Sequence, residues 1–170
     1  MGTDIHMITQ VKKDDKWKTI ERPFYGNENK YSDRNYDVFA MLANVRNGTW
    51  GEDFIPIDSP RGLPSDIEYH DNYDEAFDLG EHSFSWITLK ELLEYDWNHA
   101  YRRKAYVDPK ELKALDGQKP VSYAAWSSIG IPYEWDSTYD EAAGDFLTSF
   151  IPALQQLGDP ENVRIVFGFD

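Results

Sequence analysis

The two ends of the chain carry the pattern that most constrains its fold. Residues 3 to 11 alternate between apolar and polar side chains, so that Ile5 and Met7 point away from Asp4 and His6. Because successive strand residues face opposite sides, this pattern predicts a strand with Asp4 and His6 about 7 Å apart on one face. Residues 163 to 170 alternate in the same way. We therefore predict that the first and last strands lie in one sheet, with a shared buried face.

Turn and cap signals after the first strand predict a hairpin and then a buried helix. Residues 14–16 are turn formers followed by a second apolar stretch, which is typical of a hairpin. Apolar residues at helical spacing predict a helix over 35–47. Either Asp33 or Asn35 suits its N-cap, and Gly48 suits its end.

Two capping boxes predict further helices. Thr88 with Glu91 is the first, and Thr138 with Glu141 is the second. The apolar stripe after Thr138 predicts a long helix that kinks or restarts near Pro152, because proline lacks the backbone N–H that the helix needs.

The segments between these helices carry weaker signals. We place the basic residues of 98–104 at the end of the helix that follows Thr88 or just after it, and a short helix after Asp108. Residues 118–135 contain Gly and Pro among many aromatics, and we predict a loop that packs over another part of the molecule. The whole pattern indicates one α+β domain over residues 1–170, in two layers, with an antiparallel sheet and helices packed mainly on one face.

Composition narrows the compartment and the partners. With no cysteine, no signal peptide and no apolar run long enough to span a bilayer, we expect a soluble cytoplasmic protein without a membrane partner. The net charge of −14 argues against direct binding of nucleic acid and favours a basic partner, if there is a protein partner. Ten acidic residues between Asp66 and Asp96 face Lys90 alone. They are a solvated face or, on the alternative interpretation, a mimic of nucleic-acid charge.

Three arginines are candidates for binding an anion. Arg34 lies at the unfavourable end of the helix dipole, which suggests a specific anionic partner, either a ligand or one of the neighbouring residues Asp33 and Asp37. Arg46 suits the opposite end of the same helix, and a dipole role alone would explain it. Arg61 lies between Pro60 and Gly62, in a rigid loop that could present its guanidinium to a carboxylate or phosphate.

Polar residues also precede the predicted helix at Thr88. His82, Ser83, Ser85 and Trp86 would lie just ahead of its N-terminus, where free N–H groups favour an anion. The alternative is that the two serines stabilise a turn and His82 is structural.

These motifs together resemble a family of small phage and prophage proteins that has no assigned function. The matching stretches begin at Met1-Gly2-x-Asp4-Ile5-His6 and continue with Arg34-x-Tyr36, Pro60-Arg61-Gly62-Leu63-Pro64, His82-Ser83-x-Ser85-Trp86 and the last strand. Thr3 and Gly168 depart from the pattern, where a cysteine and a larger aromatic are expected, and Gly168 would leave space beside the last strand. The resemblance implies a role in the host cytoplasm, in counteracting host defence.

Two functions of different classes fit the candidate residues. The first is binding of a phosphorylated, nucleotide-like small molecule, without a cofactor, through arginines and stacking aromatics. The expected ligand-binding residues are Asp4, His6, Arg34, Tyr36, Arg46, Arg61, His82, Ser83, Ser85 and Trp86. The second is a metal-dependent hydrolase or phosphodiesterase, with Asp4, His6 and His82 holding a divalent metal ion. A weaker third is an acidic inhibitor of a host nucleic-acid enzyme. Whether the chain is an enzyme and whether it forms a homo-oligomer stay open.

Overall fold

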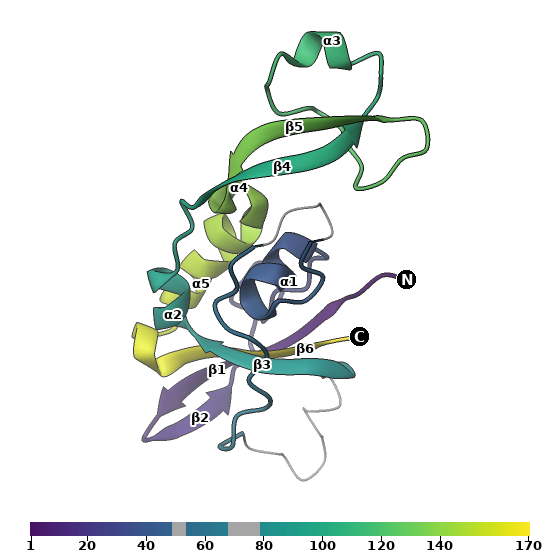
Figure 1. Ribbon diagram of the computed structural model, residues 1–170. Helices are drawn as coiled ribbons and strands as arrows, with labels where there is room; N and C mark the ends of the chain where they lie inside the picture. The colour runs from purple at the N-terminus through teal and green to yellow at the C-terminus, as the bar shows by residue number, and fades with distance from the viewer. Residues whose placement is uncertain (49–53, 68–78) are drawn as a thin grey trace.

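The computed structural model describes residues 1–48, 54–67 and 79–170 of the chain, and it has an α+β fold (Figure 1). Its main sheet has four antiparallel strands in the order β2-β1-β6-β3. The strands are β1 (Ile5–Lys13), β2 (Lys16–Thr19), β3 (His82–Thr88) and β6 (Val163–Phe169). The predicted pairing of the two terminal strands is confirmed, with Ile5 opposite Phe169 and Val11 opposite Val163. This pairing brings the two ends of the chain together.

The predicted hairpin is also confirmed. Asp14 and Asp15 join β1 to β2 with φ values of 52° and 61°. Positive φ at both central residues is the requirement of a two-residue type I′ turn, and aspartate adopts it more readily than most residues.

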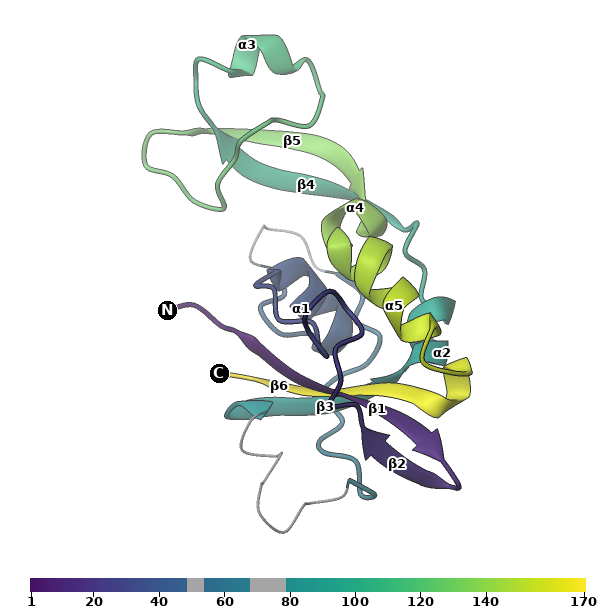
Figure 2. The same ribbon diagram turned by 180° about the vertical axis from the view of Figure 1, so that it is seen from behind.

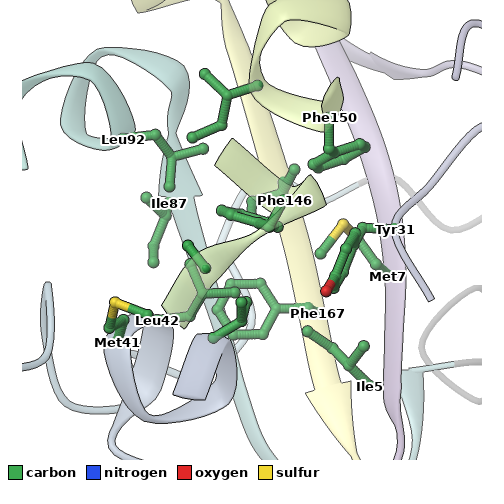
Figure 3. Packing of buried hydrophobic residues seen from close by; sticks show 14 of the residues in the cluster. Ile5, Met7, Tyr31, Met41, Leu42, Ile87, Leu92, Phe146, Phe150 and Phe167 are labelled. Carbon is green, nitrogen blue, oxygen red and sulfur yellow. The ribbon is translucent and has the colours of Figure 1, made fainter. Parts of the chain in front are cut away.

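Helices cover one face of this sheet, as predicted. They are α1 (Tyr36–Ala43), α2 (Leu89–Glu94), α4 (Tyr139–Ala143), the π-helix η2 (Phe146–Phe150) and α5 (Ile151–Gln155), with the 3₁₀ turn η3 (Pro160–Asn162) before β6. Figure 3 shows Ile5 and Met7 of β1 and Phe167 of β6 packed against Leu42 and Phe146 from the helices. Among the described residues, no helix has the length and apolar character needed to cross a bilayer.

Two of these helices differ from prediction in their extent. Helix α1 ends at Ala43 because Asn44 takes the left-handed conformation at φ 59°, so Arg46 lies beyond the helix. Asn35 is its N-cap, accepting from the backbone of Asp37 and Val38. The predicted long helix after Thr138 is instead three segments, because Gly144 ends α4 and a π-helical turn precedes Pro152. Pro152 thus lies in the first turn of α5, where its missing N–H costs nothing, and the predicted restart of the helix at this proline is confirmed.

The second face of the sheet is covered by irregular chain. Ile8 and Val166 contact Leu63, Ile67 and Leu79 on this side. All seven residues of β6 are consequently buried, including those that alternation alone would expose. Residues 49–53 and 68–78, which include five of the ten acidic residues between Asp66 and Asp96, lie outside the described residues.

Gly168 belongs to this second face, and the space expected beside it is filled. A Cβ atom at position 168 would lie 2.0 Å from the carbonyl oxygen of Leu79 and 2.7 Å from Cδ1 of Phe84. The larger aromatic side chain that the resemblance suggests would not fit here.

A separate two-stranded ribbon replaces what the sequence suggested was a helix end and a loop. Strands β4 (Ala100–Val107) and β5 (Ile131–Thr138) pair antiparallel, and α3 (Leu112–Leu115) lies in their connection. Because α2 ends at Glu94, residues 100–104 lie in a strand after this helix and not at its end. The loop predicted over 118–135 is wrong for its last residues, which begin β5. Both views in Figures 1 and 2 show α1 between this ribbon and the main sheet.

Candidate functional site

The paired terminal strands bring Asp4 and His6 into a charged cluster at the end of the sheet. Arg34 donates to both carboxylate oxygens of Asp4 at 2.7 Å, and these hydrogen bonds lower the pKa of Asp4. His6 Nε2 lies 2.8 Å from Oδ2 of Asp170, and this hydrogen bond lowers the pKa of Asp170. The acidic partner of Arg34 is thus Asp4 and not Asp33 or Asp37, because the pairing of the terminal strands brings Asp4 next to it. The cluster ties the two ends of the chain to the segment that precedes α1.

Tyr36 and Arg46 hold the first residues of the chain in place. The backbone N–H of Thr3 donates to the hydroxyl of Tyr36 at 3.1 Å, and Arg46 donates to Thr3 Oγ1 and to the carbonyl of Met1. The guanidinium of Arg46 also lies 5.5 Å from the centre of the Tyr36 ring. In the position it occupies, Arg46 fixes the N-terminal segment and does not complement a helix dipole.

Arg61, Ser85 and Trp86 form a separate network around β3. The guanidinium of Arg61 pairs with Glu91, bonds Asp58 and the carbonyl of Trp86, and lies 4.8 Å from the Trp86 ring centre. The backbone N–H of Arg61 donates to the buried hydroxyl of Ser85. The ion pair raises the pKa of Arg61 and lowers the pKa of Glu91. These contacts fasten the 58–67 segment to the sheet.

His82 and Ser83 do not lie at a helix N-terminus, which corrects the prediction for this segment. They begin strand β3, and the register shifts after His82, where Ser83 has a φ of 55°. The His82 ring stacks near Phe169, and its Nδ1 lies 2.9 Å from Oγ of Ser83. The N-terminus of α2 is six residues away and is satisfied by the predicted capping box of Thr88 and Glu91. His82 and Ser83 therefore lie away from the helix N–H groups on which the predicted anion site depended.

A cleft of about 450 Å³ lies instead between the start of α1 and the inner face of the β4–β5 ribbon. Arg34 and Tyr36, two of the sequence-predicted residues, line it together with Asn35 and Asp37. The opposite wall is contributed by the ribbon and its connection, through Tyr101, Arg103, Lys119, Tyr123, Trp135, Ser137 and Glu141. The structure thus does not bring the predicted ligand-binding residues together in one site. Two of them, Arg34 and Tyr36, line this cleft instead.

Four aromatic rings give the cleft its walls. Tyr36 lies on the α1 side, and Tyr101, Tyr123 and Trp135 lie on the ribbon side. The Tyr123 ring meets Trp135 edge to face, at 5.0 Å between centres. Burial raises the pKa of Tyr101, so its hydroxyl stays neutral across the physiological range. Walls of this kind suit a flat, partly polar ring system.

A buried ion pair fixes the spacing of the two walls. Arg103 of β4 donates to both carboxylate oxygens of Asp37, at 3.2 and 2.5 Å, and to the Tyr101 hydroxyl at 2.6 Å. The Arg103 and Asp37 side chains are only 4% and 12% exposed. Burial acts to lower the pKa of Arg103, but the contacts with Asp37 outweigh it and the pKa is raised. The pair is charged, and it joins α1 to the ribbon.

The other charged side chains of the cleft differ in whether a residue of the protein already pairs with them. Lys119 is exposed and forms no ion pair with any described residue. Arg34 is exposed but already engaged by Asp4, and Glu141 accepts a hydrogen bond from Ser137 at 2.9 Å. The backbone N–H groups of Asp37 and Val38 are already capped by Asn35. An anionic group would therefore meet Lys119 first.

The metal-site hypothesis needs Asp4, His6 and His82 on one metal ion. Asp4 is bonded to Arg34, His6 to Asp170, and His82 lies on the far side of β6, opposite Phe169. Among the described residues, no group of three or more His, Asp or Glu side chains could hold a metal.

Sequence reasoning missed the ribbon residues of the cleft, although a signal was present. Tyr101, Arg103, Ala105 and Val107 alternate with more exposed neighbours, and Trp135 and Ser137 alternate in β5. This alternation is hard to see in the sequence because residues 102–104 are all basic. Arg103 is buried, although its charge is the same as that of its exposed neighbours Arg102 and Lys104.

No family model, no curated protein and no solved structure matches the chain. The function is therefore argued from the side chains of the cleft.

Proposed function

We propose that the cleft between α1 and the ribbon binds a phosphorylated, nucleotide-like small molecule. One observation carries this proposal. Four aromatic rings and Lys119, which forms no ion pair with a described residue, line one cavity of about 450 Å³. Small-molecule sites in proteins commonly enclose 300 to 1,000 Å³ and combine apolar walls with a few fixed polar groups.

Each part of such a ligand has a counterpart in the cleft. A base or ribose would stack between Tyr36 and the ribbon aromatics, where Tyr101 and Trp135 are held by packing. A phosphate would pair with Lys119. Arg34 would donate a further hydrogen bond to the phosphate while it stays paired with Asp4. Asn35 and Ser137 also line the cleft, although their side chains already have hydrogen-bond partners within the protein.

The cleft favours holding the ligand over transforming it. Asp37 is neutralised by Arg103, and Glu141 is engaged by Ser137, so both carboxylates of the cleft already have partners. Following the resemblance to phage proteins, the role we propose is sequestration of a nucleotide-derived immune signal of the host.

A release experiment tests this proposal against the hydrolase alternative. The protein is incubated with ADP-ribose and with cyclic dinucleotides, with and without a chelator, separated from free ligand and then heated. Recovery of intact nucleotide supports sequestration. Loss of nucleotide that the chelator prevents supports a metal-dependent hydrolase with Asp4, His6 and His82, and the absence of both binding and turnover contradicts both functions.

A matched pair of lysine variants locates the phosphate contact. Lys119→Ala should weaken binding about tenfold, which is the effect of losing one charge-assisted hydrogen bond. Lys113→Ala removes the same charge from α3, outside the cleft, and should leave the affinity unchanged.

A further inference from the structure

A second hollow, distinct from the cleft, lies where the segment 55–57 meets the end of α2. Its volume is about 350 Å³, and Ile55, Pro56 and Ile57 form one side. Tyr95 and Tyr139 form the other. We refer to it as the tyrosine groove. None of these residues belongs to the proposed nucleotide site.

The walls of the tyrosine groove are fixed by hydrogen bonds to a single residue. The hydroxyl of Tyr95 donates to the carbonyl of Ile55, and the N–H of Ile55 donates to the hydroxyl of Tyr139 at 3.0 Å. The two tyrosine rings are nearly parallel, at 19°, with centres 6.0 Å apart. Ile57 is in turn held by its bond to the carbonyl of Met41. The groove is thus formed in advance of any partner.

Two exposed carboxylates lie on its rim. Glu94 and Asp96 are 66% and 70% exposed, with Lys90 at 4.0 Å from Glu94 and His99 at 3.7 Å from Asp96. The contact between His99 and Asp96 is an ion pair only when the imidazole is protonated. The last turn of α2 also lacks a basic residue, although cations are favoured at that end of a helix. Glu91, by contrast, is neutralised by Arg61.

We propose that the tyrosine groove binds an arginine side chain of a basic protein partner. The aliphatic stem would lie on Ile55 and Ile57, and the flat guanidinium would pack against the partly exposed ring of Tyr95. Its fork of N–H groups would pair with Glu94 and Asp96 at the rim.

The charge of the whole chain supports this choice of partner. A net charge of −14 attracts a basic protein over long range and repels nucleic acid. Arginine fits better than lysine because its planar cation can stack and pair at once, whereas an ammonium group cannot stack.

A titration with blocked amino acids tests the proposal. Acetyl-arginine methylamide is added to the labelled protein, and amide shifts are followed by NMR at 55–57 and 94–99. We expect shifts confined to these residues. The citrulline analogue, which has the same shape but no charge, should bind at least fivefold more weakly, and the lysine analogue should also bind more weakly than arginine.

Charge-matched variants separate a site from general attraction to an acidic surface. Glu94→Gln with Asp96→Asn should weaken arginine binding at least fivefold. Asp159→Asn with Glu161→Gln removes the same charge from exposed positions before β6 and should change it less than twofold. An equal loss in both double variants, equal binding of citrulline, or shifts that lie elsewhere would each overturn the proposal. All four positions are exposed, so unchanged melting temperatures are expected and confirm that the variants fold.

Discussion

Replacing Arg103 by methionine tests whether the buried ion pair holds the ribbon against α1. Methionine keeps most of the volume of the arginine stem, but it leaves the carboxylate of Asp37 without its cation at 12% exposure. Removing one partner of a buried pair typically costs about 3 to 5 kcal/mol, because the other charge stays desolvated. With a urea dependence of about 2 kcal/mol per M, the unfolding midpoint should fall by about 2 M.

The assay is urea unfolding followed by tryptophan fluorescence, to which Trp135 beside Arg103 contributes. The matched control is Arg102→Met, because Arg102 is the neighbouring arginine on the exposed face of β4, where it pairs with Glu134 and Asp136. Its midpoint should stay close to that of the wild type, since exposed pairs contribute little. Adding Asp37→Asn to Arg103→Met should recover at least half of the loss. Equal midpoints for the two single variants would refute the role that we assign to the pair.

Three further predictions concern the remainder of the structure. Arg61→Ala should destabilise the protein by about 2 kcal/mol in urea unfolding, because Arg61 is only 19% exposed and bonded to Glu91. It should leave nucleotide binding intact, and a loss of binding without a loss of stability would instead place Arg61 in the ligand site. Gly168→Ala should lower the melting temperature by several degrees, since its Cβ would overlap the carbonyl of Leu79. Gly158→Ala is the control and should not lower it, because an added Cβ there has no neighbour closer than 3.7 Å. Similar melting temperatures for the two variants would argue against the close packing of Gly168. The pKa of Glu91 is lowered below 4.5 by Arg61, so its contribution to stability is present above pH 4.5 and is lost as the pH falls below it. Glu91→Gln should therefore flatten the dependence of unfolding free energy on pH below about 4.5, and an unchanged slope would contradict this.

Sequence patterns predicted the main sheet well because its strands obey simple rules. Alternation placed β1 and β6, the turn at Asp14 placed β2, and the capping box at Thr88 placed the start of α2. These signals are local, and tertiary contacts reinforce them. The segment before Thr88 was misjudged because His82, Ser83 and Ser85 suit both a loop and an edge strand, and pairing with β6 decides between them.

The candidate site was harder to predict because its charges are paired over long sequence distances. Arg34 with Asp4, and Arg103 with Asp37, join residues 30 and 66 positions apart, which no spacing rule connects. Arg61 looked available for a ligand because its partner Glu91 lies 30 residues away. The aromatic content of 118–135 did suggest packing over another part of the molecule, and Tyr123 does line the cleft.

Hydrogen–deuterium exchange of the protein saturated with a nucleotide recovered in the release experiment is the most direct test of the proposed site. We predict slower exchange at 35–37, 101–103, 119–123 and 135–137, where α1 and the ribbon face each other across the cleft. Exchange at 61 and at 82–86 should not change. Protection at 61 and 82–86, with none in the ribbon, would contradict the proposal and return the site to the residues that the sequence first suggested.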